Sequence, residues 1–126
     1  MKYYAFILLL FAETAIAQPN LTVVSAALSK GDVTTLSQYF DANLEIVTET
    51  LDGSYTKAQA TTLLKEFFAK SKPAGFTISS SGAARDKGSH YCIGKLVAGG
   101  KNYRINIFFK EVNSAFLIKE MRIEED

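Results

Sequence analysis

The chain has 126 residues, of which 48% are hydrophobic and 21% are charged, and these values are typical of one globular domain. Its 14 Lys and Arg against 13 Asp and Glu leave a formal charge of +1, and the charges are scattered along the chain. This pattern excludes the basic patch of a nucleic-acid-binding protein and the clustered cations of a polybasic membrane segment. The net charge and its distribution therefore do not indicate any binding partner.

The N-terminus has the order of a secretory signal. One Lys precedes an apolar run at residues 5–12, and Ala15-Ile16-Ala17 supplies the small residues of a cleavage site. The run is shorter than the roughly 20 residues of a membrane span, and no Cys follows it for lipid attachment. We predict a cleavable signal peptide at residues 1–17, cut after Ala17. The alternative is a buried N-terminal helix.

The mature chain, residues 18–126, is then a single exported domain, periplasmic or secreted, without a stable membrane anchor. Its only cysteine is Cys92, which excludes an intrachain disulfide. The strand-like run around Cys92 favours a buried thiol that acts as a small hydrophobic residue. Two alternatives remain open, namely a nucleophile paired with His90 on the same strand face and a disulfide between two chains.

The first half of the mature chain predicts two helices and a strand. Apolar residues recur at helical spacing from Leu21 and end at Lys30-Gly31, which indicates a first helix. Asp32 is placed as the N-cap of a second short helix that runs through Tyr39 and Phe40. Residues 44–50 alternate and are rich in β-branched side chains, so they predict a strand.

A long third helix follows a turn at Asp52-Gly53. Thr56 and Gln59 fit a capping box at its start. The apolar stripe of this helix consists of Ala60, Leu63, Leu64, Phe67 and Phe68. Pro73 prevents its continuation, and the stripe predicts packing against a core.

The period changes to two from Gly75 onward. This alternation predicts four antiparallel strands at residues 76–81, 89–97, 103–110 and 116–123. Gly99-Gly100 is predicted to form a two-residue hairpin turn, because such turns need a positive φ that glycine adopts without strain. In the last strand, Phe116 and Ile118 are out of phase with Met121 and Ile123, which predicts a bulge between them. The fold class is therefore α+β, with helices packed on one face of a strongly curved antiparallel sheet.

These elements resemble the cone-shaped, cystatin-like nuclear transport factor 2-like superfamily. More narrowly, the chain resembles a family of small exported bacterial proteins whose function is undefined. That resemblance is carried by the runs Tyr39-Phe40, Tyr55-Thr56-Lys57-Ala58-Gln59-Ala60, Phe67-Phe68, Tyr91-Cys92-Ile93-Gly94-Lys95-Leu96 and Met121-Arg122-Ile123-Glu124. It implies a pocket between the long helix and the sheet, which in relatives holds a small apolar ligand and sometimes an acid/base pair. It also implies a homodimer through the convex sheet face.

The candidate pocket residues are Tyr39, Tyr55, His90 and Tyr103. Their alternative is a structural role, since a tyrosine at the core edge buries its ring and keeps its hydroxyl wet. No catalytic set can be matched to the superfamily's enzymes. No second His or Cys stands at ligand spacing from His90, so we predict no metal site, and no motif indicates a cofactor.

The candidate dimer face is the side of the predicted strand 103–110 that carries Arg104, Asn106 and Phe108. An apolar patch mixed with Arg is typical of interfaces, and we expect Cys92 and Leu96 to join it.

The sequence leaves three hypotheses for the function. The leading one is a non-catalytic exported module that binds a small apolar ligand or an envelope protein. The others are a cone-pocket isomerase, dehydratase or hydrolase, and a structural homodimer with a filled core.

Overall fold

The computed structural model describes residues 18–126, so the predicted signal peptide at residues 1–17 lies outside the described residues. The elements in chain order are α1 (Leu21–Lys30), α2 (Val33–Ser37), β1 (Phe40–Val47), β2 (Asp52–Thr56), α3 (Lys57–Lys70), β3 (Pro73–Ala83), β4 (Ser89–Ala98), β5 (Lys101–Val112) and β6 (Ala115–Glu125). No helix in this part of the chain is long and apolar enough to cross a membrane.

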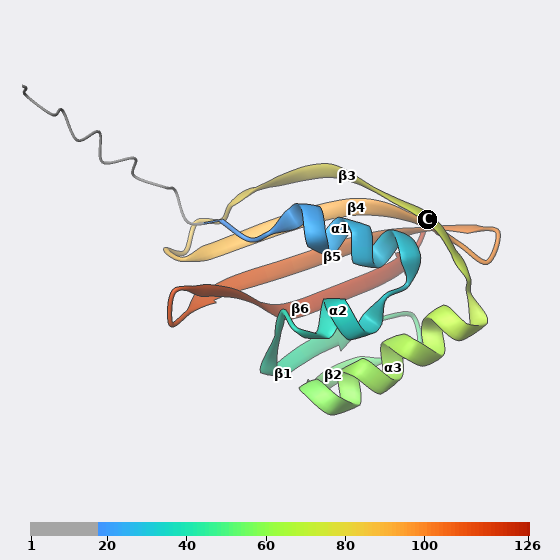
Figure 1. Cartoon of the computed structure of the whole chain (residues 1–126), viewed down its shortest axis with the longest axis horizontal. Helices are drawn as coiled ribbons and strands as arrows, with labels where there is room; N and C mark the ends of the chain where they lie inside the picture. The colour runs from blue at the N-terminus through green and yellow to red at the C-terminus, as the bar shows by residue number, and fades with distance from the viewer. Residues whose placement is uncertain (1–17) are drawn as a thin grey trace, which may run out of the picture.

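The six strands form one curved sheet in the order β2-β1-β6-β5-β4-β3 (Figure 1). Strands β3 to β6 are an antiparallel meander, which confirms the four strands predicted for the second half. Strand β1 pairs in parallel with β6 and antiparallel with β2. Strand β1 therefore lies between β2, which follows it in sequence, and β6, the last strand.

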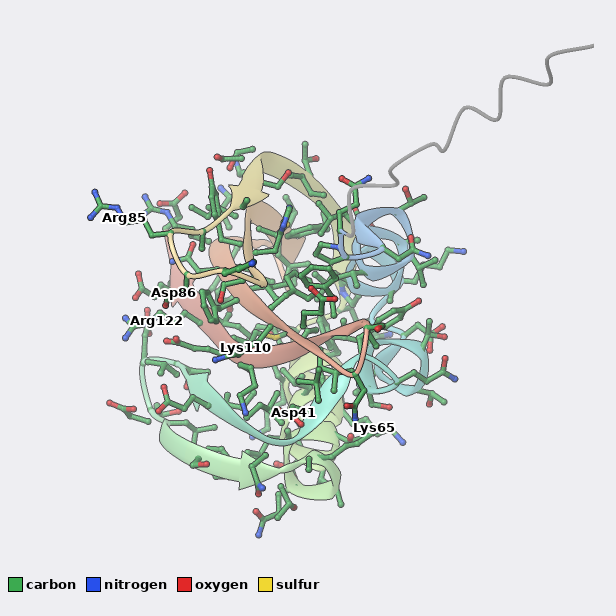
Figure 2. All side chains as sticks on the ribbon, turned by 90° about the vertical axis from the view of Figure 1, so that its left-hand side faces the viewer. Asp41, Lys65, Arg85, Asp86, Lys110 and Arg122 are labelled. Carbon is green, nitrogen blue, oxygen red and sulfur yellow. The ribbon has the colours of Figure 1, made fainter. Side chains whose placement is uncertain are left out.

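The helices pack against one face of the sheet and leave the other face uncovered (Figures 1 and 2). This arrangement confirms the predicted α+β class. The core between the two layers includes Val24, Leu28, Leu36, Leu64, Ile105, Ile107, Phe109, Ile118 and Met121, all at most 2% exposed. Helix α1 is also tied to β3, because the Ser29 hydroxyl accepts a hydrogen bond from the Phe76 amide at 3.0 Å and donates one to the Phe76 carbonyl at 3.4 Å.

The predicted helix caps are present. Thr56 and Gln59 form the reciprocal capping box of α3. Asp32 caps α2 by accepting hydrogen bonds from the hydroxyl and the amide of Thr35. These bonds favour the charged carboxylate, so they lower the pKa of Asp32.

Two predicted boundaries were wrong. Helix α2 ends at Ser37, and Phe40 begins β1 instead of continuing the helix. The amide of Ile118 donates to the Tyr39 carbonyl, so the backbone at this point bonds across to β6 and not along a helix. The turn predicted at Asp52-Gly53 lies inside β2, an edge strand whose own sequence favours strand structure weakly. Pairing with β1 compensates for that weak preference.

The two predicted irregularities of the meander are confirmed. Gly99 and Gly100 have φ values of 58° and 76° at the hairpin turn between β4 and β5. In β6, Ile118 pairs with Phe109 and Glu120 pairs with Phe108, so Lys119 is an extra residue in the ladder. This bulge lets Ile118 and Met121 both enter the core, where each is fully buried.

The bulge residue Lys119 binds Asp41 of β1, with 2.7 Å between Lys119 Nζ and Asp41 Oδ2. This hydrogen bond lowers the pKa of Asp41, and the amide of Ala42 contributes to the shift. Because the folded pKa lies below the unfolded value of about 3.9, the pair stabilises the protein above that pH and loses its contribution as the pH falls through the folded pKa.

We therefore expect Asp41→Asn to lower the free energy of unfolding by about 1 kcal/mol at neutral pH. Urea denaturation from pH 7 down to pH 2 measures the effect, and the difference from wild type should shrink below about pH 4. Lys101→Gln is the matched control, and we expect it to lower the free energy of unfolding less than Asp41→Asn does. It removes an ion pair with Glu125 that is longer, at 3.6 Å, and more exposed. If the free energies of unfolding of wild type and Asp41→Asn differ by the same amount at every pH, this explanation is contradicted.

Candidate functional site

A pocket of about 440 Å³ lies between α3, the loop that joins β1 to β2, and the ends of β5 and β6. Its floor is apolar and comes from four parts of the sequence. The floor residues are Ile46, Leu51, Leu63, Leu64, Phe67, Tyr103 and Ile123. A volume in this range with an apolar floor is typical of sites for small molecules.

Helix α3 forms one wall of the pocket. Its inner stripe of Ala60, Leu64 and Phe68 is buried, while Leu63 and Phe67 are half-buried one turn apart. The Phe67 ring meets the Tyr103 ring edge to face, with 5.3 Å between ring centroids and 79° between ring planes. This aromatic contact joins the helix to β5 across the floor.

The β1–β2 loop forms the opposite wall, and its shape is fixed by its own hydrogen bonds. The Thr48 hydroxyl accepts from the amides of Thr50 and Leu51 at 3.2 and 3.0 Å. The Thr48 amide donates to the Leu51 carbonyl at 2.7 Å. The pocket is therefore bounded by a tight turn on one side and a capped helix on the other.

The rim of the pocket carries the exposed side chains Glu49, Glu66, Lys70, Lys101 and Glu125. Lys101 and Glu125 form an ion pair of 3.6 Å. The charged groups thus stand at the mouth, and the floor offers a ligand hydrocarbon contacts and the Tyr103 phenol. Among the described residues, no group of three His, Cys, Asp or Glu side chains is placed to hold a metal ion.

The four pocket residues proposed from the sequence do not share one cavity. Tyr103 lines the pocket described above, and Tyr55 lines a second, more open groove with Ala58, Gln59, Thr62 and Leu63 on α3. Tyr39 packs against the core and lines neither of these cavities.

His90 lies at the far end of the β4–β5 pair, opposite Phe109 in the ladder and six residues along β5 from Tyr103. Its ring contacts Phe116, with 5.9 Å between ring centroids. At about 3.4 Å per strand residue, this places His90 and Tyr103 roughly 20 Å apart along the sheet.

Sequence reasoning missed the β1–β2 loop and the rim carboxylates Glu49 and Glu66. The signal that could have found the loop is the run 48–51 between two segments able to pair as a hairpin. Phe67 and Leu63 were identified, but only as members of a core stripe.

Cys92 and Leu96 do not join the outer sheet face, so that expectation was wrong. In the ladder Cys92 lies beside Ile107 and Leu96 beside Tyr103, which places both on the helix-covered face. They are 1% and 0% exposed, because the strand alternation at β4 is opposite in phase to the one assumed.

Burial raises the pKa of the Cys92 thiol. We therefore expect no reaction of native protein with 5,5′-dithiobis(2-nitrobenzoate), and one thiol per chain after unfolding in guanidinium chloride. Val97→Cys is the matched control, because Val97 is 36% exposed on the same strand and its thiol should react in native buffer. Equal reaction rates of native and unfolded wild-type protein would contradict the buried position.

The outer face does carry Arg104, Asn106 and Phe108, as predicted. Their side chains alternate with the buried Ile105, Ile107 and Phe109 along β5. Asn106 lies between Ile93 and Arg122 in the ladder, and Arg122 projects on the side away from the helices (Figure 2). The Asn106 Oδ1 atom is buried and has no hydrogen-bond partner among the described residues.

Comparison with known families gives one match, to a domain of unknown function, DUF4783, over residues 21–124. The chain belongs to the DUF4783 family. This confirms the narrower resemblance drawn from the sequence. A search of the curated proteins finds no significant match.

Solved DUF4783 structures share this architecture. A protein from Bacteroides ovatus ATCC 8483 is 29% identical, with a TM-score of 0.80 over 89% of this chain and 98% of its own. One from Bacteroides fragilis YCH46 is 30% identical, with a TM-score of 0.77 over 82% of this chain and 96% of its own. A nuclear transport factor 2-like protein from Cytophaga hutchinsonii ATCC 33406 is 10% identical, with a TM-score of 0.63 over 84% and 92%. This third likeness places the DUF4783 chain in the nuclear transport factor 2-like fold and carries no activity with it.

Proposed function

We propose that this DUF4783 protein is an exported binding module that holds a small, largely apolar ligand between α3 and the sheet. The observation that carries the proposal is the pocket with its apolar floor, including the joined rings of Phe67 and Tyr103. The loop and the helix that bound it are each fixed by local hydrogen bonds, so little order has to be gained on binding.

The lining favours binding over catalysis. An isomerase, dehydratase or hydrolase of this fold would need a base or an acid aimed into the apolar part of the pocket. Here the carboxylates Glu49 and Glu66 stand exposed at the rim, and His90 is remote from Tyr103. The filled-core hypothesis assigns no role to this pocket, which lies open at the edge of the packed core.

Native mass spectrometry of protein purified from its own host tests both parts of the proposal. We expect a chain that begins at Gln18, found in the envelope or outside the cell, and an additional mass that is released on denaturation. Leu63→Lys should lose that mass because it places a charge in the apolar floor of the pocket, whereas the outer-face control Val97→Lys should keep it. A ligand-free wild type, or equal retention by Leu63→Lys, would contradict binding in this pocket. A chain that keeps residues 1–17 would contradict export by cleavage.

A homodimer through the outer sheet face is the second candidate, and the mixed apolar and charged side chains of that face favour it. Phe108 is half-buried there and Arg104 is exposed on the same face of β5. An apolar side chain mixed with Arg is typical of interfaces, and Phe108 would contribute apolar contact area. The pocket lies on the helix side of the sheet, so ligand binding and dimerisation are compatible.

Light scattering after gel filtration tests the homodimer. We expect twice the chain mass at high concentration, and a monomer for Phe108→Arg. The control Thr34→Arg changes an exposed residue of α2, on the opposite side of the sheet, and should leave the dimer intact. A strict monomer of wild type at high concentration would contradict this candidate.

A further inference from the structure

Only some of the charged side chains at the pocket mouth form ion pairs with one another. Lys101 is matched by Glu125. Among residues 18–126, no ion pair within 4 Å involves Glu49, Glu66 or Lys70. One cation and two carboxylates of the rim are therefore open to a ligand.

Lys70 has compensating partners on its own helix. It lies in the last turn of α3, where the free carbonyls form the negative end of the helix dipole and attract an ammonium group. Glu66 precedes it by four residues, which is the favourable orientation for such a pair on a helix surface. Lys70 is therefore a weak site for a ligand anion.

Glu49 has no such compensation. It stands on the β1–β2 loop, across the pocket from α3, and the loop's hydrogen bonds are made by Thr48 and backbone groups. The mouth therefore has an excess of one carboxylate, because Glu66 is offset by Lys70 and Glu125 by Lys101, which leaves Glu49. Glu49 would repel a ligand anion, whereas it would attract an ammonium group.

We infer that the ligand is a small amphipathic amine, with an aromatic or aliphatic body on the apolar floor and an ammonium group at the mouth beside Glu49. This inference rests on the proposed binding function and adds the chemical class of the ligand. The Phe67 and Tyr103 rings favour an aromatic body, because they offer edges and faces at which a third ring can pack.

Three probes that differ in the charge of the head group test the inference, namely 2-phenylethylamine, 2-phenylethanol and phenylacetate. Their dissociation constants are measured by titrating ¹⁵N-labelled protein and following the amide resonances of Leu63, Phe67 and Tyr103. We expect the amine to bind roughly fivefold tighter than the alcohol at low salt, which is the upper range for a solvent-exposed ion pair. We expect phenylacetate to bind more weakly than the alcohol. The preference should shrink in 0.5 M NaCl, because salt screens exposed charges.

Glu49→Gln should reduce the preference for the amine over the alcohol to about twofold or less, while affinity for the alcohol stays unchanged. Glu45→Gln is the matched control, because Glu45 is exposed on β1 and does not line the pocket. It should keep the full preference.

The possible results separate the inference from the proposed function. Equal binding of amine and alcohol, tighter binding of phenylacetate, or a full preference in Glu49→Gln would overturn the amine class. Each of these results still supports a ligand pocket, since the probes bind at its floor. If none of the three probes shifts the resonances of the floor residues, the pocket itself fails and both conclusions fall.

Discussion

Replacing Phe109 with alanine lowers the free energy of unfolding by about 3–5 kcal/mol, the largest effect we expect from a single substitution. Phe109 is 0% exposed and lies on the helix-covered face of β5, beside Ile118 of β6. Removing its ring leaves a cavity that the surrounding helices and strands cannot close completely. Urea denaturation followed by circular dichroism measures the loss.

The control is the neighbouring residue on the same strand. Phe108 points to the outer face and is half-buried, so Phe108→Ala should cost the monomer about 1 kcal/mol or less. If the two variants lose equal stability at low protein concentration, the assignment of the two faces of β5 is wrong. A cost of Phe108→Ala that grows with protein concentration would instead indicate a dimer held by that face.

Gly94→Ala should lower the free energy of unfolding by about 1–3 kcal/mol, although it adds a single methyl group. A Cβ atom at this position would overlap the Phe76 ring of β3 and lie 2.8 Å from the Thr77 carbonyl oxygen. The carbonyl belongs to the paired backbone of β3, so only a shift of the strand can relieve the contact. Gly94 is thus required for the close approach of Phe76 across the β3–β4 pair.

Gly75→Ala is the matched substitution, because a Cβ atom there would meet nothing within 4 Å. We expect its stability to remain within about 0.5 kcal/mol of wild type. Thermal unfolding of the two variants side by side measures the difference. Equal melting temperatures would show that the Phe76 ring does not cover Gly94.

Much of the fold could be predicted because it is encoded by local patterns. The capping box at Thr56 and Gln59 fixes the start of α3, and the paired glycines at 99 and 100 fix the turn between β4 and β5. The phase change around Lys119 gave the bulge in β6. Each of these signals lies within a few residues of the structure that it specifies.

The errors occur where distant pairing decides the structure. Phe40 continues a helical pattern in sequence, yet it begins a strand because β6 supplies a parallel neighbour. Strand β2 is formed by residues that favour turns, and only its pairing with β1 makes it a strand. Cys92 was assigned to the wrong face of β4, because the alternation of side chains does not indicate which face the helices cover.

The pocket was predicted in outline only, for the same reason. Ile46, Phe67 and Ile123 meet on its floor, although they come from β1, α3 and β6. Their meeting depends on the β1–β6 register, in which Ile46 lies beside Met121, and no local pattern encodes a register between the first strand and the last. The residues that the sequence did single out, such as Tyr39 and His90, attracted attention by their chemical type and not by their position.

The parallel pairing of β1 with β6 also bears on the order in which the chain can fold. Strands β3 to β6 can form by closing short hairpins, whereas β1 gains its central neighbour only when residues 118–122 have been synthesised. Contacts of such long sequence separation form slowly and late. The pocket floor, to which β6 contributes Ile123, is consequently among the last parts to be completed. A chain that is still emerging from the ribosome lacks both this floor residue and the parallel neighbour of β1.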